Sequence, residues 1–452
     1  MLRATTIWLC VCAGACSGAD SSSDTTTSTG ASTSAGPTDG SGESSASTTS
    51  GTCPSPIVGC PCDPGGVCVG AARCEGGVCT DEPTATESTE SDDTTDTGAP
   101  AACGDGIAAA GELCLLAPTL LMMGTAPSDV GLANFDGDPA LDLVTVNRDD
   151  NQVALRVGDG NGSFGVRTAH ATGSGPLALA VGDFDGDAHN DLVTVDSTAN
   201  SVTWLRGASN GSFIVGATFP SGLGPAALVS ADFAADGRDD VIVANVGDAT
   251  IGVFLATKVP FVPMAAYAVG VGPRGLALAD VTDDGDVDLL VANAGSATIG
   301  LLLGNGDGLF GAAAAFPVGS EPRAVAGGDV NGDGLGDAVA VEGSGSITRL
   351  LGNGLGSFGA ALPFATAVSP SDLVLLDLDI DGDLDLVIAS TGDSTLRVLL
   401  NGGAGDFTEV LQIVTGPSPV AVTAADIDGD GLPDLAAANQ GGGTVTIVLS
   451  DA

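Results

Sequence analysis

The chain has 452 residues, with 57 Asp and Glu against 12 Lys and Arg, and a formal net charge of −45. So few basic residues could not neutralise phosphates, which excludes nucleic acid as a partner. Aromatic residues make up only 4% of the chain and there are 69 glycines, a composition that suits many thin, similar core layers.

The first sixteen residues have the pattern of an export signal. Arg3 supplies a positive charge, and the apolar stretch Thr5–Val11 is too short to span a bilayer. Ala13-Gly-Ala-Cys16 resembles the lipobox of bacterial lipoproteins, although Leu is usual at Ala13. We therefore expect an exported protein anchored through a lipid on Cys16, at the outer membrane or cell surface. Simple secretion and an uncleaved structural start are the alternatives.

Composition divides the next hundred residues. Residues 17–52 and 81–100 are mostly Ser, Thr, Gly and acidic residues, which predicts disordered linkers. Between them, residues 53–80 hold six cysteines and are too short to bury a core, so we expect disulfides. Six cysteines allow fifteen pairings, and the sequence does not choose among them. A zinc site at Cys60 and Cys62 is the rival interpretation.

Residues 101–116 form a short segment from Cys103 to Cys114. It resembles a truncated cysteine-rich repeat common in secreted proteins of myxobacteria, but Leu115 and Leu116 replace the usual acidic continuation. From residue 117 to 452 the pattern changes to short apolar runs separated by Gly-rich turns, which we expect to form one domain.

Seven copies of one nine-residue acidic loop recur in this domain at intervals of 48 or 49 residues. The copies begin at Asn134, Asp183, Asp232, Asp280, Asp329, Asp377 and Asp426. So regular a period indicates an array of one supersecondary unit. The second unit predicts four strands, at 176–183, 192–196, 201–206 and 214–220. Four antiparallel strands in each of seven units predict an all-β, seven-bladed β-propeller.

The two ends of this domain are complementary. The last unit stops after its third strand, whereas residues 119–124 resemble a fourth strand without a blade. We expect this segment to complete the seventh blade, which would close the ring without a free sheet edge.

The loops carry carboxylates at positions 1, 3, 5 and 9, as in Asp183-Phe-Asp-Gly-Asp-Ala-His-Asn-Asp191. Hard oxygen ligands at this spacing suit calcium. Carboxylates about 5 Å apart repel by about 3 kcal/mol per pair at an effective dielectric constant of about 20, which argues against metal-free turns. An EF-hand is excluded because Thr194 stands at position 12 and a strand follows.

The motif Asp-x-Asp/Asn-x-Asp-Gly-x-x-Asp-Leu, with a downstream Asn-Gly-x-Phe corner, resembles FG-GAP/VCBS repeats, which form the propeller of integrin α subunits. The resemblance implies that the loop joins the first two strands of a blade. It also implies about five to six structural calcium ions, each held by side chains 1, 3, 5 and 9 and by the carbonyl of residue 7. The implied ligands are Asp183, Asp185, Asp187 and Asp191 in copy two; Asp280, Thr282, Asp284 and Asp288 in copy four; Asp329, Asn331, Asp333 and Asp337 in copy five; Asp377, Asp379, Asp381 and Asp385 in copy six; and Asp426, Asp428, Asp430 and Asp434 in copy seven.

Two copies depart from the pattern. The first, with Asn134, Asp136, Asp138 and Asp142, lacks one charge and has Pro139 where Gly is usual, so we expect weaker binding. The third has Ala234 at position 3, which leaves only Asp232, Asp236 and Asp240, so we expect an empty or weak site. His189 stands at the carbonyl position of copy two and is not expected to bind through its ring. Position 2 is apolar in every copy and should anchor the loop in the core.

Nothing in the sequence assembles a catalytic site. His170 and His189 are isolated, and no His-Glu-x-x-His occurs. Some polysaccharide lyases use related calcium-bearing propellers, so Lys258, Tyr267 and Arg274 keep that alternative open.

In integrin-like propellers, ligands bind the face opposite the calcium loops. We expect Arg148, Arg274 and Arg323 on that face, as a hypothetical site for an anionic ligand such as a carboxylate or an acidic sugar; solvated surface arginines are the plain alternative. The sequence thus predicts an exported, monomeric, calcium-binding surface protein for adhesion or for binding a protein or glycan. A carbohydrate-active enzyme and a scaffold subunit are the alternatives.

Overall fold

The computed structural model describes residues 73–75, 78–80, 113–256 and 261–451. The predictions for Cys16, the linkers, most of the cysteine module and Lys258 lie outside these residues. Within the module, β1 (Arg73–Glu75) and β2 (Val78–Thr80) form an antiparallel hairpin in which Cys74 lies opposite Cys79. Among the described residues there is no helix long and apolar enough to cross a membrane.

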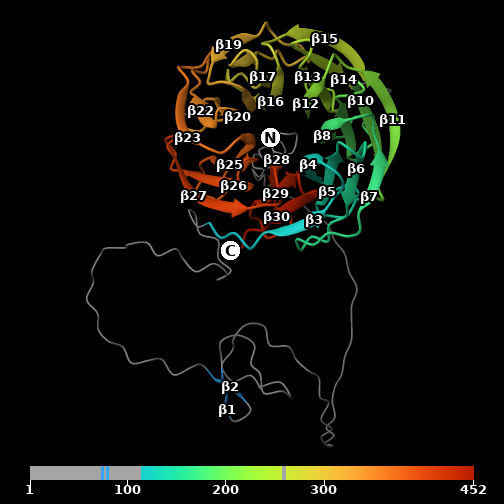
Figure 1. Cartoon of the computed structure of the whole chain (residues 1–452), viewed down its shortest axis with the longest axis vertical. Coiled ribbons are helices and arrows are strands. Elements are labelled where there is room, and N and C mark those ends of the chain that lie inside the picture. Colours follow the sequence, from blue (N-terminus) through green and yellow to red (C-terminus); the bar gives the residue numbers. More distant parts are fainter. Residues whose placement is uncertain (1–72, 76–77, 81–112, 257–260, 452) are drawn as a thin grey trace, which may run out of the picture. The chain divides into compact units, whose positions relative to one another are not determined.

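The rest of the described chain forms seven four-stranded antiparallel sheets, arranged as blades around one axis (Figure 1). This confirms the predicted all-β, seven-bladed propeller. The first three blades are β4 (Pro127–Ala133), β5 (Asp142–Asn147), β6 (Gln152–Arg156) and β7 (Thr168–Ala171); β8 (Pro176–Gly182), β9 (Asp191–Asp196), β10 (Ser201–Ala208) and β11 (Ser212–Pro220); and β12 (Pro225–Ala231), β13 (Asp240–Asn245), β14 (Thr250–Leu255) and β15 (Val262–Ala268).

The remaining blades repeat this order, with the last strand of the seventh taken from the start of the domain. They are β16 (Pro273–Ala279), β17 (Asp288–Asn293), β18 (Thr298–Leu302) and β19 (Ala314–Pro317); β20 (Pro322–Gly328), β21 (Asp337–Glu342), β22 (Ser346–Leu350) and β23 (Leu362–Thr366); β24 (Pro370–Leu376), β25 (Asp385–Ser390), β26 (Thr395–Asn401) and β27 (Phe407–Val414); and β28 (Pro419–Ala425), β29 (Asp434–Asn439), β30 (Thr444–Val448) and β3 (Thr119–Met122).

Burial differs systematically across a blade. Every residue of the second strand is buried in all seven blades, as in β9, whereas the outermost strand is largely exposed, as in β7. The second strand packs against neighbouring blades on both faces, so its sequence is a continuous apolar run rather than an alternating one. The four segments predicted for the second blade match β8 to β11 to within two residues at each end.

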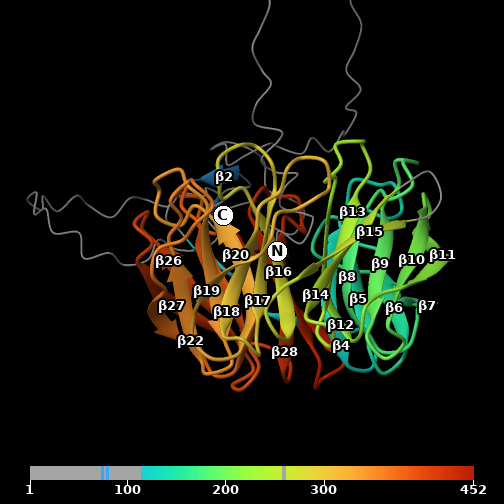
Figure 2. The ribbon, with the colours of Figure 1, turned by 90° about the horizontal axis from the view of Figure 1, so that it is seen from above.

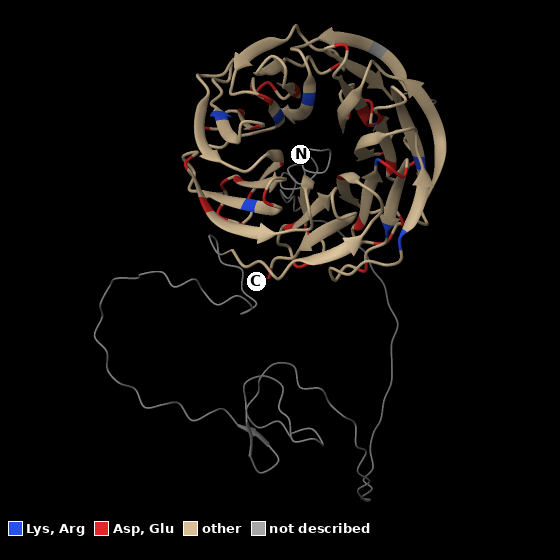
Figure 3. Cartoon of the chain, viewed as in Figure 1, with Lys and Arg blue, Asp and Glu red and all other residues tan. Residues whose placement is uncertain are grey.

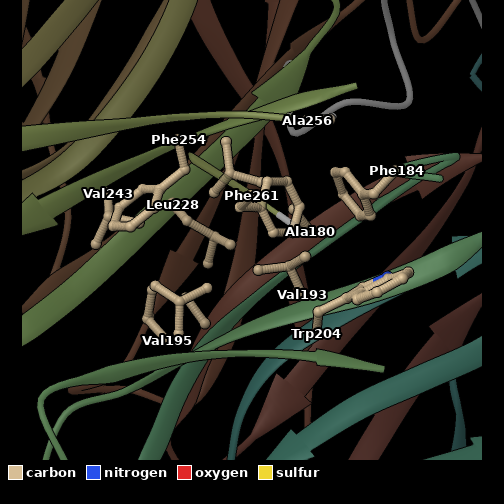
Figure 4. Close-up of a cluster of buried hydrophobic side chains, with 13 residues drawn as sticks. Ala180, Phe184, Val193, Val195, Trp204, Leu228, Val243, Phe254, Ala256 and Phe261 are labelled. Carbon is tan, nitrogen blue, oxygen red and sulfur yellow. The ribbon is translucent and has the colours of Figure 1, made fainter. Parts of the chain in front are cut away.

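The core consists of seven clusters, each lying between two neighbouring blades. The cluster between the second and third blades has three aromatic contacts, more than any other cluster (Figure 4). There Phe261 packs edge-on against Phe184 at 5.4 Å and Trp204 at 6.4 Å between ring centroids. The core is thus a ring of thin layers, as the low aromatic content suggested.

The ring closes as predicted. Strand β3 pairs antiparallel with β30, and the pairing continues upstream through a bridge between Leu115 and Ser450. The cluster between the seventh and first blades packs Ile427 and Val445 against Val130 and Leu132. The first segment of the domain therefore supplies the outer edge of its last blade.

The two ends of the blades form two different faces (Figure 2). We call the end where the acidic loops join the first and second strands the loop face, and the opposite end, where tight turns join the second and third strands, the hairpin face. Each innermost strand has a β-bulge at the hairpin face: Pro127 lies opposite Asn147 and Asp129 opposite Val146, so Ser128 is the extra residue. Bulges of this kind re-aim a side chain.

Candidate functional site

The ninth residue of each acidic loop is a buried aspartate that joins two parts of its blade. Asp434 accepts the N–H of Ile427 near the loop start at 2.7 Å and that of Ser450 after the third strand at 2.7 Å. The same two bonds recur in every copy, with Ala234 as the first donor in the third. These aspartates, all 0% exposed, are Asp142, Asp191, Asp240, Asp288, Asp337, Asp385 and Asp434.

Backbone N–H groups hold the other loop side chains in place. In six copies the N–H of position 6 donates to the second oxygen of position 1, as Gly431 does to Asp426 at 3.0 Å. The first copy cannot make this bond, because Pro139 has no N–H. Position 5 accepts from position 7, as Asp430 does from Leu432 at 2.8 Å. The first loop therefore differs in backbone as well as in charge.

Three loops bring three carboxylates together, with one oxygen from each within 4.8 Å of the others. These clusters are Asp183, Asp185 and Asp191; Asp377, Asp379 and Asp385; and Asp426, Asp428 and Asp434. In copies four and five the third position is Thr282 and Asn331, and no such group of three carboxylates forms among the described residues of these loops. Their calcium sites stay predictions.

Burial and mutual repulsion make the clusters unfavourable without a cation. Burial, followed by the charges of Asp185 and Asp187, raises the pKa of Asp191 to about 7. Burial likewise raises the pKa of Asp385 and of Asp434 to about 6. In the sixth loop, Oδ1 of Asp377 is buried and accepts no hydrogen bond. A donor set of hard carboxylate oxygens with an unpartnered buried oxygen fits a divalent cation such as calcium.

An arginine that the sequence analysis missed lies on the second loop. Arg206 contacts the carboxylate of Asp185 and donates to that of Asp187 at 2.8 Å. The charge of Asp185 is the main cause that raises the pKa of Arg206. Arg206 follows the third-strand core residues of its blade, and the six equivalent residues are aliphatic: Val157, Leu255, Leu303, Leu351, Leu400 and Leu449. Aligning the copies on this position would have revealed it.

The third loop also holds a basic side chain. Arg238 pairs with Asp236 at 3.1 Å, and this loop has no acidic residue at position 3, where Ala234 stands. Its neighbour Asp239 accepts the N–H of Asp183 at 3.1 Å and so joins the third loop to the second. An arginine thus pairs with a predicted ligand in two adjacent loops.

The apolar second position of each loop is buried, which confirms its predicted packing role. The exposed fraction does not exceed 6% for any of Phe135, Phe184, Phe233, Val281, Val330, Leu378 and Ile427. The loops are therefore fixed at both ends, by an apolar side chain at position 2 and by a hydrogen-bonded carboxylate at position 9.

Tyr267 and Arg274, which the structure describes among the residues considered for a lyase, do not line a common cavity. The hydroxyl of Tyr267, on the outermost strand β15, accepts the N–H of Phe310 at 3.0 Å. Arg274 lies on the innermost strand β16, and the cavities that it lines do not include Tyr267. His170 packs edge-on against Phe213 at 5.2 Å between ring centroids.

Two of the three predicted ligand-binding arginines lie together. Arg274 and Arg323 are the bulge residues of β16 and β20, at the hairpin face. Arg148 lies on the same face, in the turn after β5, but pairs with its neighbour Asp149 at 2.9 Å and lines neither cavity. Figure 3 shows how few basic segments the ring carries among its acidic ones.

Both arginines line two cavities. The axial cavity, of about 150 Å³, is bounded by all seven innermost strands, and the flanking cavity, of about 370 Å³, lies over the third to fifth blades. The bulge residues around the axial cavity are Ser128, Leu177, Ala226, Arg274, Arg323, Ser371 and Val420.

Comparison with solved structures supports the fold. BBS1N, solved in complex with ARL6DN, has a TM-score of 0.54 at 13% identity, over 75% of this chain and 96% of that one. A protein from Lactobacillus plantarum has a TM-score of 0.53 at 14% identity, over 67% and 88%. A lectin from Agrocybe aegerita that recognises non-reducing terminal N-acetylglucosamine has a TM-score of 0.50 at 17% identity, over 75% and 96%.

Comparison with protein families identifies the repeats. No curated protein sequence matches the chain. The model of the FG-GAP-like repeat matches residues 134–194, 183–243, 280–340, 329–388 and 377–437, and each match begins at the first residue of an acidic loop. Since these matches together cover more than half of the chain, the protein belongs to the family built from FG-GAP-like repeats.

Proposed function

We propose that this protein is an exported, calcium-stabilised propeller that binds a protein or glycan ligand outside the cell, in adhesion or surface recognition. The observation that carries the metal part is the sixth loop, where Asp377, Asp379 and Asp385 converge and one oxygen of Asp377 has no partner. The cation would offset the repulsion among the carboxylates and fix the loop between two strands.

Ligand binding is supported by the family and by the fold. FG-GAP-like repeats match residues 134–243 and 280–437 of the propeller, and a lectin of similar fold recognises N-acetylglucosamine. Export is supported by the sequence of the first sixteen residues and by Cys114, which is disulfide-bonded as expected in an oxidising compartment. The lyase alternative is less favoured, because Tyr267 and Arg274 do not line a common cavity.

The test is metal content and thermal unfolding of the full chain, with calcium and after chelation. We expect several calcium ions per chain and a melting temperature at least about 10 °C lower after EGTA, since bound ions stabilise the folded state by mass action. Magnesium at the same concentration is the control and should restore little, because it demands smaller octahedral sites. Unchanged melting and no bound calcium would contradict the metal assignment.

The binding part needs a second measurement. Calcium-loaded protein should retain glycans or extracellular proteins on an array, and the signal should fall after chelation. Binding to no ligand by a calcium-loaded, folded protein would favour the scaffold alternative. Turnover of an acidic polysaccharide would favour the enzyme.

A further inference from the structure

We infer that Arg274 and Arg323 form a binding site for the carboxylate of an acidic sugar at the hairpin face, beside the axial cavity. The inference rests on the proposed function, because it names the ligand class of a binding propeller. It concerns the face opposite the acidic loops and residues that contact no predicted calcium ligand.

The first argument is that Arg274 has no partner among the residues that the structure describes. Nine arginines lie between residues 113 and 451. Eight donate to a carboxylate or a backbone carbonyl, whereas Arg274 makes no hydrogen bond or ion pair with any residue that the structure describes. It is exposed on a chain whose net charge is −45. A free guanidinium on so acidic a protein is available to an anionic ligand.

The second argument is that the backbone brings the two arginines together. Residue 275, directly after Arg274, is glycine, while the equivalent residues of the other six blades carry side chains. A Cβ at Gly275 would lie 2.8 Å from the Cα of Ala324 and 2.8 Å from the carbonyl oxygen of Arg323. Only glycine allows so close an approach of β16 and β20, so the two bulge residues lie side by side.

The third argument is that Arg323 is held in position. Its Nη1 donates to the carbonyl of Pro370 in the next blade at 3.3 Å, and its Nη2 lies 3.9 Å from Glu321. Glu321 is 68% exposed, so this weak ion pair leaves most of the guanidinium charge uncompensated. The planar forks of two neighbouring arginines suit the two oxygens of a carboxylate.

The rest of the site favours a sugar as the carrier of that carboxylate. The axial cavity is also lined by Ser128 and Ser371, whose hydroxyls donate to backbone carbonyls and can still accept hydrogen bonds from sugar hydroxyls. Its volume of about 150 Å³ suits one ring-sized group rather than a folded partner. The site thus combines cationic donors on two blades with hydroxyl acceptors on others.

The experiment is calorimetric titration of the full chain, loaded with calcium, with methyl glucuronide. The neutral methyl glucoside and N-acetylglycine, a peptide-like carboxylate, are the two comparison ligands. We expect a dissociation constant of about 1 mM for the glucuronide, at least tenfold weaker binding of the glucoside, and weakening by salt. Equally strong binding of the glucoside would contradict the assignment of an anion-binding site. Equally strong binding of N-acetylglycine would contradict the assignment of a sugar as the ligand.

Variants assign the site. Arg274→Gln and Arg323→Gln should each weaken glucuronide binding about tenfold, since each removes a charge-assisted hydrogen bond. Glu321→Gln should strengthen it a few-fold. Arg148→Gln, on the same face but outside both cavities, is the matched control and should change nothing. Unchanged binding in Arg274→Gln would overturn the inference.

Failure of this inference differs from failure of the proposed function. If the same calcium-loaded sample ignores glucuronide but retains a neutral glycan or a protein, the arginine site is wrong and the binding function stands. If chelation changes neither melting nor glucuronide binding, the arginine site stands and the calcium role is wrong.

Discussion

The second and seventh acidic loops have the same four aspartates at the same spacing but different surroundings. In the seventh, Asp428 and Asp430 have no basic partner among the described residues, and Leu449 packs near Gly162 of the first blade. In the second, the residue equivalent to Leu449 is Arg206, which pairs with Asp185 and Asp187. The nine-residue motif therefore determines where the carboxylates lie. A residue after the third strand, outside the motif, determines whether a basic side chain competes with the metal ion for them.

The largest expected effect separates the structural carboxylate of the seventh loop from its metal-binding ones. Asp434→Ala leaves the buried N–H groups of Ile427 and Ser450 without an acceptor, which should cost about 3 kcal/mol even without metal. The measurement is urea unfolding in EGTA. Asp428→Ala is the control and should cost little there, because Asp428 is more exposed and its removal relieves repulsion. Equal losses in EGTA would contradict the distinction.

The pH dependence of the metal-free protein should reverse that of the calcium form. Burial raises the pKa of Asp191 to about 7 and that of Asp434 to about 6, above the ordinary 3.8. Their protonation therefore stabilises the fold fully below about pH 4, and this contribution is lost as pH rises through 6 to 7. We expect metal-stripped protein to lose on the order of 2 kcal/mol between pH 4.5 and 7.5.

Thermal unfolding at the two pH values is the measurement. With calcium the trend should invert, because protons compete with the ion for the same carboxylates. In the metal-free protein, Asp191→Asn should make stability depend less on pH in the upper part of this pH range. A metal-free protein that becomes more stable between pH 4.5 and 7.5 would contradict the raised pKa values.

The comparison of the two loops predicts that Arg206 weakens metal binding in the second. Arg206→Leu, which restores the residue type of the other copies, should raise affinity there about tenfold, since a competing cation is removed. Terbium luminescence provides the measurement, because the indole of Trp204 donates to Asp191 at 3.0 Å and so lies beside this one loop.

Two variants control this measurement. Trp204→Phe should abolish the sensitised signal, which assigns it to the second loop. Arg148→Leu, which lies on the other face, should leave terbium affinity unchanged. If Arg206→Leu lowered the affinity, Arg206 would be supporting the loop rather than competing with the ion.

Most of the fold could be predicted because one unit is repeated. The period fixed the number of blades, and the strand lengths of the second unit followed from apolar runs that fill the space between blades, as in Leu192 to Val195. Closure by β3 was also predictable, since one blade lacked a strand and one strand lacked a blade. The apolar pattern of the strands, the period of the repeats and the closure of the ring all predict the same fold.

The candidate sites were less predictable, because they depend on contacts between repeats. The motif gave the positions of Asp377, Asp379 and Asp385 but not the unpartnered oxygen of Asp377, which depends on burial. The sequence predicted a role for Arg274 and Arg323. It did not predict the β-bulges that orient their side chains, or that Gly275 lets β16 and β20 approach each other closely. Such features arise from packing between blades. In the sequence they are visible only as single residues that differ from the equivalent residues of the other repeats.

The smallest expected effect concerns backbone strain in the sixth loop. Position 4 has a positive φ in every copy, which suits Gly429 at 82° but not the β-branched Ile380 at 59°. Ile380 is 42% exposed, so it gains little from burial, and Ile380→Gly should stabilise the protein by about 1 kcal/mol in urea unfolding. The reverse change, Gly429→Ile, should destabilise it by a similar amount. If both changes destabilised the protein, the contacts of Ile380 would outweigh its strain, and the sixth loop would differ from the seventh in packing as well as in backbone.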